Sequence, residues 1–98
     1  MRRSPSFTPQ ARRELDEAAD YYEAESPGLG LAFLSAIEEA LEQILEYPES
    51  APVSRGTVRR KGLRRFPYDL LYSIRPGSIR ILAVMSQKRR PFYWWGRR

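Results

Sequence analysis

Apolar residues recur at helical spacing in the first half of the chain. Between residues 11 and 22 they fall on one stripe of a helix, while acidic residues occupy most of the remaining positions. Thr8 can cap this helix with its side-chain oxygen, and Pro9 suits the first helical position, where its missing N–H costs nothing. The pattern predicts an amphipathic helix that begins after Thr8. Its apolar stripe consists of Ala11, Leu15, Ala18, Ala19 and Tyr22.

A second helix is expected after a break at Ser26-Pro27-Gly28. Ser26 is a candidate cap for it, and glutamates occupy the face opposite its apolar stripe. Pro48 ends the pattern, because proline disfavours the helical conformation in the residue before it. Two antiparallel helices joined by a short turn follow from these signals. The second stripe consists of Phe33, Leu34, Ile37, Leu41, Ile44 and Leu45.

Beyond residue 57 the hydrophobic pattern changes to the alternation that is typical of strands. Val58–Phe66 is predicted as a basic strand with an interruption at Gly62, and Tyr68–Arg75 as a second strand. Pro76-Gly77 fits the centre of a tight turn, because proline presets φ and glycine accepts a positive φ. In the second strand, Leu70, Tyr72 and Ile74 are expected on one face. In the return strand, Ile79, Ile81, Ala83 and Met85 are expected on one face, and Arg80, Leu82 and Val84 on the other.

These elements predict a single α+β domain over residues 1–98. A two-helix antiparallel hairpin should pack on a small antiparallel sheet of three to four strands, with Ser4–Phe7 as a possible edge strand. The segment from Pro48 to Gly56 is polar and interrupted by proline, so we expect it to be a mobile loop.

The composition excludes several classes of function. No apolar run approaches the roughly 18 residues that span a bilayer, and the N-terminus lacks the apolar region of a signal peptide. The chain has no cysteine, which removes disulfide and thiol chemistry, and we expect a cytoplasmic location without a membrane partner. It also has no histidine, the commonest general base and metal ligand. No spacing of residues indicates a metal or an organic cofactor, so none is expected.

Charge divides the chain into two halves. Residues 1–50 carry four Lys/Arg and eleven Asp/Glu, whereas residues 51–98 carry thirteen Lys/Arg and a single carboxylate, Asp69. The formal net charge of +5 conceals this polarity. A field of one sign attracts opposite charge, so the basic half predicts an anionic partner, either nucleic acid or an acidic protein. The alternative interpretation is a basic face that is solvated and has no partner.

Aromatic residues are interleaved with these basic groups. The segment from Lys88 to Trp95 combines three basic residues with four aromatic ones, a composition that suits both single-stranded RNA and protein interfaces. One of Trp94 and Trp95 is expected to close the end of the core, and the other to be exposed. Tyr68 and Tyr72 are predicted to be structural, since alternating aromatic residues mostly line cores.

Three segments together resemble the RelE/ParE superfamily of toxins from bacterial toxin–antitoxin modules. They are SPGLGLAFLSAIEEALEQILEYPESAP, LRRFPYDLLYSI and IRILAVMSQKRRPFYW. The resemblance covers nearly the whole chain and implies the strand–helix–helix–three-strand fold of that superfamily. RelE-like members cleave mRNA on the ribosome, whereas ParE-like members inhibit DNA gyrase by binding. A third possibility is a non-toxic subunit that binds an antitoxin and acts as a co-repressor.

The chain departs from the ribonuclease members where they carry chemistry. Related sequences often have histidine just before the terminal Arg-rich segment, where this chain has Met85-Ser86-Gln87. Cleaving members place arginine after the tyrosine of the middle strand, and this chain has Asp69 there. Arginine is a poor base because it stays protonated. If the chain is a ribonuclease, the candidates are Lys61 as the general base, Arg89 as the group that holds the phosphate, and Tyr93 as the group that positions a nucleobase. The departures nevertheless favour the ParE-like branch.

The predicted partners are a cognate antitoxin and either DNA gyrase or the ribosome with its mRNA. A homodimer or a toxin–antitoxin hetero-oligomer is compatible with the sequence. The antitoxin is expected either on the helix pair, through Leu15, Ala19, Tyr22 and Phe33, or against the basic sheet. The predicted target-binding residues are Arg59, Arg60, Lys61, Arg64, Arg65, Arg80, Arg89, Arg90, Tyr93 and Trp94.

Overall fold

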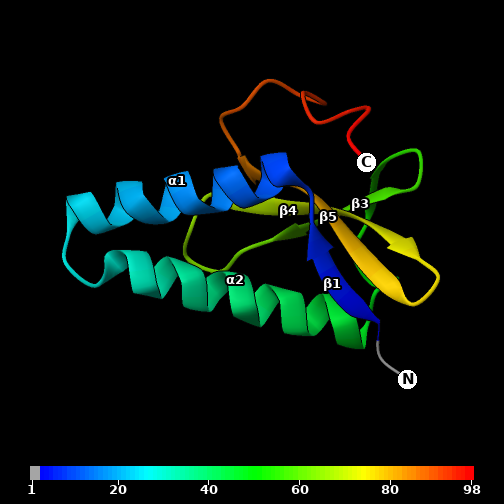
Figure 1. The fold of residues 1–98 in the computed structure, drawn as a ribbon, viewed down its shortest axis with the longest axis horizontal. Coiled ribbons are helices and arrows are strands. Elements are labelled where there is room, and N and C mark those ends of the chain that lie inside the picture. Colours follow the sequence, from blue (N-terminus) through cyan, green and yellow to red (C-terminus); the bar gives the residue numbers. More distant parts are fainter. Residues whose placement is uncertain (1–2) are drawn as a thin grey trace.

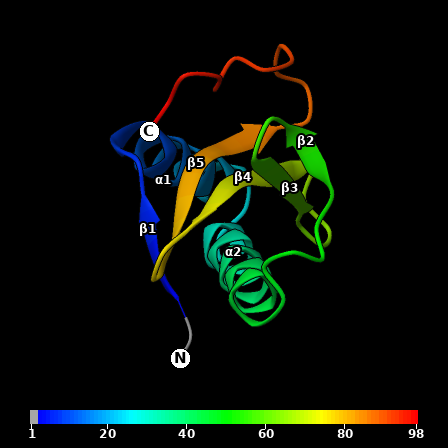
Figure 2. The same ribbon diagram turned by 90° about the vertical axis from the view of Figure 1, so that its right-hand side faces the viewer.

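The computed structural model describes residues 3–98 as two helices packed on one twisted sheet (Figure 1). The helices are α1 (Pro9–Glu25) and α2 (Leu29–Glu46), and the strands are β1 (Ser4–Phe7), β2 (Val53–Arg55), β3 (Val58–Gly62), β4 (Tyr68–Arg75) and β5 (Ser78–Ser86). Both helices lie on one face of the sheet (Figure 2). No helix within residues 3–98 is long and apolar enough to cross a bilayer.

The sheet has five strands in the order β1-β5-β4-β3-β2, so the predicted α+β class is confirmed but the expected strand count was too low. The predicted edge strand β1 is present and pairs parallel to β5, whereas the other neighbours are antiparallel. The additional strand β2 lies within the segment that was expected to be a loop. The basic strand ends at Gly62 rather than Phe66, and β4 has the predicted bounds.

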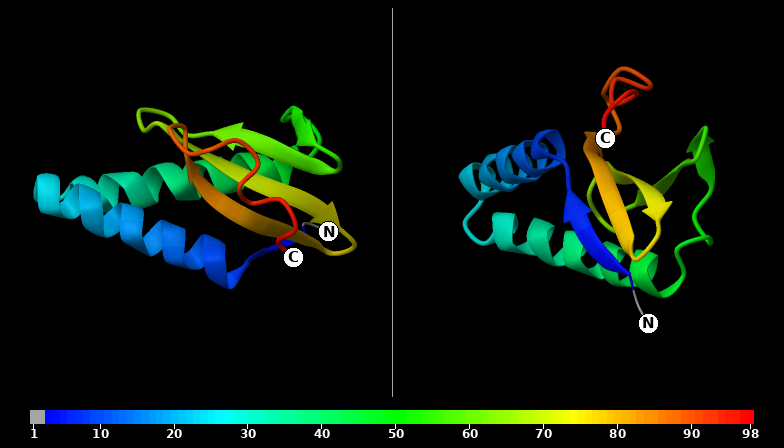
Figure 3. Two further views of the ribbon diagram at one scale, coloured as in Figure 1. Left: turned by 90° about the horizontal axis from the view of Figure 1, so that it is seen from above. Right: turned by 45° about the vertical axis from the view of Figure 1, so that its right-hand side comes forward.

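The two helices are fixed by caps at their N-termini. Thr8 Oγ1 accepts a hydrogen bond from Ala11 N at 3.0 Å, as the sequence predicts. The cap of α2 is Gly28, not Ser26, and its φ of +88° is one that glycine adopts without strain. Gly28 has no side chain to accept from the helix, so the carboxylate of Glu23 in α1 accepts from the N–H groups of Gly28 and Gly30 instead. This contact joins the C-terminal end of α1 to the N-terminal end of α2, and Figure 3 shows that the two helices run side by side in opposite directions.

A bulge in β5 changes which residues face the helices. Leu71 is opposite Ala83 and Tyr72 is opposite Ile81, so Leu82 has no partner in β4. The prediction that Ile79, Ile81, Ala83 and Met85 share one face is therefore wrong, because the alternation reverses at this point. The backbone groups that the irregular edge leaves free find other partners: the Leu82 carbonyl accepts from Thr8 and Arg97, and Val84 N donates to Glu14.

The reversal creates two apolar cores. One lies between the sheet and the helices, and the residues that it takes from β4 and β5 are Leu70, Tyr72, Ile79, Ile81 and Val84. The other lies on the opposite face and consists of Val58, Leu71, Leu82, Ala83, Met85 and Trp94. The C-terminal segment 87–98 supplies Trp94 and thereby covers this second face (Figure 3).

Candidate target-binding surface

Six of the side chains predicted to bind a target lie in three separate places. Arg60 and Lys61 line a hollow beside the edge of β3, Arg64 and Arg65 lie next to α2, and Arg89 and Tyr93 lie beside α1. The residues that line these three places do not overlap. The basic half of the chain therefore does not form one site with one geometry.

Three of the predicted target-binding residues have structural roles. Arg59 donates from Nη1 to the carbonyls of Glu49 and Ala51, at 3.0 and 2.7 Å, and so holds the loop before β2. Arg80 donates to the Phe7 carbonyl at 3.0 Å and to the Arg98 carbonyl at 3.2 Å. Trp94 is 1% exposed and fills the second core. The prediction that Trp94 contacts a target is corrected accordingly, because its ring is covered.

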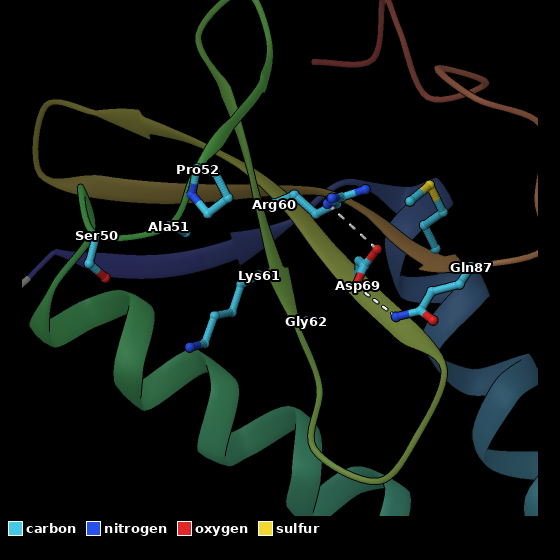
Figure 4. A pocket seen from close by; sticks show the side chains of 9 residues that line it. Ser50, Ala51, Pro52, Arg60, Lys61, Gly62, Asp69 and Gln87 are labelled. Carbon is cyan, nitrogen blue, oxygen red and sulfur yellow. Dashed lines mark hydrogen bonds and ion pairs between the residues drawn. The ribbon is translucent and has the colours of Figure 1, made fainter.

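The hollow beside β3 contains the one carboxylate of the basic half. Asp69 is buried, and its Oδ1 accepts from Gln87 Nε2 at 3.3 Å while its Oδ2 lies 3.9 Å from Arg60 Nε. Figure 4 shows that Arg60 extends toward Asp69, whereas Lys61 extends to the other side of β3. Lys61 is thus separated from the carboxylate by its own strand.

The C-terminal segment is attached to α1 through Glu14. Tyr93 Oη donates to Glu14 Oε2 at 2.6 Å, and Arg97 Nη1 lies 2.9 Å from Glu14 Oε1. The Arg89 guanidinium stacks 4.2 Å from the centre of the Tyr93 ring. Burial raises the pKa of Tyr93 above its ordinary value, and the hydrogen bond to Glu14 raises it further. Tyr93 is therefore a protonated hydrogen-bond donor near neutral pH, and not a base.

The residues that a ribonuclease would use are not brought together. Lys61 lines the hollow beside β3, while Arg89 and Tyr93 line a separate groove with Glu14 and Glu17. A ribose 2′-OH and its neighbouring phosphate need a base, an acid and a cation within reach of one another. Among residues 3–98, the three ribonuclease candidates do not provide such a group.

The structure contains an exposed cation–aromatic cluster that the sequence does not predict. Arg55 lies 4.2 Å from the Trp95 ring centre and 5.1 Å from that of Phe92. Trp95 and Phe92 are 48% and 42% exposed, so the expectation that one tryptophan is buried and one exposed is confirmed. The aromatic ending is visible in the sequence, but nothing there indicates that Arg55, nearly 40 residues earlier, stacks on it.

The predicted antitoxin contacts on the helix pair are largely core residues. Leu15 and Phe33 are buried, and Ala19 and Tyr22 pack against the same core. The Tyr22 ring lies 5.3 Å from Phe33 and 4.9 Å from Phe66. Leu15 and Phe33 are thus corrected to core positions, because the sheet already covers them. Tyr68 and Tyr72 are structural as predicted, and Tyr72 Oη donates to the Pro48 carbonyl at 2.6 Å.

Comparison with known proteins assigns this fold to a family. Residues 6–91 match the family model of the ParE toxin of the type II toxin–antitoxin system parDE. A solved structure described as the chromosomal ParDE TA system from P. aeruginosa is similar, with a TM-score of 0.74 and 23% identity over 86% of this chain and 95% of that chain. No curated protein matches the chain. Because the family model spans most of the sequence, this chain belongs to the ParE toxin family of type II toxin–antitoxin systems.

Proposed function

We propose that this ParE-family chain inhibits DNA gyrase by binding to it, and that a cognate antitoxin neutralises it. The observation that carries the proposal is the separation of the ribonuclease candidates, together with the state of Tyr93. Lys61 lies apart from Arg89 and Tyr93, and the Tyr93 hydroxyl is already bound to Glu14. Binding requires no catalytic group, so this arrangement favours a binding toxin over one that cleaves RNA with Lys61, Arg89 and Tyr93.

We place the target contact on the C-terminal segment, together with the exposed cluster of Arg55, Phe92 and Trp95. Arg89 and Arg90 are exposed there, in the same C-terminal segment as the exposed rings of Phe92 and Trp95. Arg55 lies over both rings and so competes with a nucleobase for the faces on which it would stack. Exposed aromatic edges beside arginine are instead typical of protein interfaces, with acidic groups on the partner.

The antitoxin is proposed to cover the helical hairpin at its exposed apolar side chains rather than at the core residues. Tyr21 and Leu31 are 58% and 70% exposed. An amphipathic segment that buries them would also meet the acidic faces of both helices, so we expect it to carry basic residues near those contacts. Alanine at both positions should weaken neutralisation while toxicity without the antitoxin persists.

The test of gyrase inhibition uses purified protein and a matched pair of double variants. Gyrase supercoiling of relaxed plasmid should be inhibited by the wild-type chain and much less by Arg89→Glu/Arg90→Glu. The control, Arg12→Glu/Arg13→Glu, changes the net charge equally at exposed positions of α1 and should inhibit like the wild type. Equal inhibition by both variants would move the contact away from residues 89 and 90.

A cellular measurement separates binding from RNA cleavage. After induction of the chain alone, incorporation of labelled thymidine should fall before incorporation of labelled methionine. Early loss of methionine incorporation, accompanied by truncated mRNA, would support the RelE-like ribonuclease and contradict the gyrase proposal. Harmless expression without an antitoxin would instead support the co-repressor hypothesis.

A further inference from the structure

The hollow beside β3 combines a carboxylate with a basic and an apolar lining. Its volume is about 600 Å³, and it is lined by Ser50, Ala51, Pro52, Arg60, Lys61, Gly62, Asp69, Met85 and Gln87 (Figure 4). This volume lies within the range of roughly 300–1,000 Å³ that small-molecule sites occupy. Among residues 3–98, no strand pairs with the outer edge of β3 at Lys61 and Gly62, because β2 begins at Val53, opposite Arg59. The hollow is therefore open at an uncovered sheet edge.

Asp69 has hydrogen-bonding capacity that the protein does not use. A carboxylate offers about four acceptor positions, and those of Asp69 have one hydrogen bond at 3.3 Å and one ion pair at 3.9 Å. Its side chain is 7% exposed and lines the hollow, so a ligand bound there can reach the unused positions. Gln87, which makes the hydrogen bond, is exposed and can rotate away. A ligand with two adjacent N–H donors would supply hydrogen bonds to these unused acceptor positions.

Gly62 keeps the approach to this carboxylate open. It lies opposite Asp69 in the β3–β4 pair, and a Cβ added there would be 3.3 Å from Asp69 Oδ1. Any side chain at this position would therefore crowd Asp69 Oδ1. Pro52 and Met85 supply apolar surface nearby, which suits a flat ring.

The surrounding charge selects an anionic ligand. Asp69 is the single carboxylate among thirteen basic residues in the second half of the chain, and Arg60 beside it is 54% exposed. A cationic ligand, such as an arginine side chain, would meet this positive field and the Arg60 guanidinium. A ligand that carries a neutral edge of hydrogen-bond donors and a phosphate would donate to the carboxylate and would also place its negative charge in the positive field. Arg60 has five N–H donors and can face the phosphate while its Nε remains toward Asp69.

We propose that this hollow binds a guanosine phosphate, with the guanine N1–H and N2–H₂ groups donating to the Asp69 carboxylate. Guanine is the one standard base with two adjacent donors on its pairing edge. Adenine and cytosine each place a ring acceptor beside their amino group, and uracil places its N–H between two carbonyl oxygens, so each would set an acceptor against the carboxylate. The site is independent of gyrase, and it assigns Asp69 a role as the specificity-determining residue.

The test compares ligands that differ by single groups on the full-length protein. Binding of guanosine 5′-monophosphate, inosine 5′-monophosphate and adenosine 5′-monophosphate is measured by calorimetry and by NMR shifts at Gly62 and Asp69. Inosine lacks the N2 amino group and should bind about tenfold to a hundredfold more weakly, because one hydrogen bond to a charged acceptor is lost. The adenine nucleotide should bind more weakly still. Equal affinities, or equal binding of inorganic phosphate, would overturn the proposal.

Two variants and one control test whether the nucleotide binds in this hollow. Asp69→Asn should abolish the preference for guanine over inosine, and Gly62→Ala should weaken binding of the guanine nucleotide while the fold, checked by circular dichroism, persists. Asp16→Asn removes an exposed carboxylate of α1 and should bind like the wild type. Unchanged binding in folded Asp69→Asn and Gly62→Ala would overturn the assignment to this hollow.

The source of the guanosine is decided by the same assay. A short single-stranded oligonucleotide with one internal guanosine is compared with its inosine counterpart and with the free nucleotide. Tighter binding of the guanosine oligonucleotide would identify a guanosine within nucleic acid as the ligand, and binding of the free nucleotide alone would identify a soluble nucleotide. Both results support a guanosine site, whereas no discrimination between guanosine and inosine in either form contradicts it.

Discussion

Replacing Glu14 by alanine removes one carboxylate that holds three donors from two parts of the chain. Its oxygens accept from Val84 N at 3.1 Å, from Arg97 Nη1 at 2.9 Å and from Tyr93 Oη at 2.6 Å. Glu14 thus joins α1 to the end of β5 and to the C-terminal segment. We expect Glu14→Ala to destabilise the whole domain, because the second core depends on that segment for Trp94.

The magnitude follows from how well water can replace each contact. Val84 is 2% exposed, so its N–H would remain without an acceptor, at a cost of about 2 kcal/mol. Arg97 retains its hydrogen bond to the Leu82 carbonyl and its side chain is 17% exposed, and Tyr93 is partly exposed, so together they add about 1–2 kcal/mol. The sum of about 3 kcal/mol corresponds to a decrease in Tm of roughly 12 °C or more for a domain of this size.

The assay is thermal and urea unfolding followed by circular dichroism, with tryptophan fluorescence reporting the C-terminal segment. Glu17→Ala is the matched control, because Glu17 is an exposed residue of the same helix and should change stability by about 0.5 kcal/mol at most. A double-mutant cycle with Tyr93→Phe should give a coupling of about 1 kcal/mol. Equal melting of Glu14→Ala and Glu17→Ala would refute the reasoning, since the three contacts would then contribute nothing.

Further predictions concern the buried aromatic residues and the helix contact. Because burial raises the pKa of Tyr93, the stability of the wild-type chain should fall as the pH rises above about 10. In thermal melts between about pH 8 and pH 11, Tyr93→Phe should lose less stability than the wild type. An equal loss in both proteins would contradict this linkage. In urea, Trp94→Ala should cost about 3–5 kcal/mol and Trp95→Ala about 1 kcal/mol, because the first ring is 1% and the second 48% exposed; similar costs would disprove the assignment. Gly30→Ala should cost about 1–3 kcal/mol by urea unfolding, since its Cβ would lie 2.8 Å from the Ala19 carbonyl oxygen, and a cost below about 0.5 kcal/mol would mean that the helices separate easily.

The parts of the fold that depend on neighbouring residues could be predicted from the sequence. The Thr8 cap, the apolar stripes of both helices and the bounds of β4 each follow from residues within a few positions of one another. The turn at Pro76-Gly77 is also local, and Gly77 has the expected positive φ of +68°. Such signals are sufficient because caps, helix periodicity and turns are formed by contacts close in sequence.

The parts that depend on distant residues could not be predicted. Strict alternation placed Ala83 and Met85 on the helix face, but the bulge at Leu82 reverses it. Thr8, Glu14 and Arg97 support that bulge from positions far away in the sequence. Nothing in the sequence around Leu82 indicates these partners. The same holds for Arg55 on Trp95, which joins a short strand to the chain end.

The count of basic residues predicts a field, but it does not predict a contact surface. Arg59 and Arg80 donate to neutral carbonyls, and these hydrogen bonds hold their guanidinium groups without cancelling their charge. They still contribute to the long-range attraction of an acidic partner, while their donors are no longer free to bind it. Arg89 and Arg90 are exposed, so they can both attract the partner at long range and contact it directly. Long-range attraction mainly sets the association rate and its salt dependence, whereas close contacts mainly set the dissociation rate. The two functions of the basic half therefore belong to different residues, and only the structure distinguishes them.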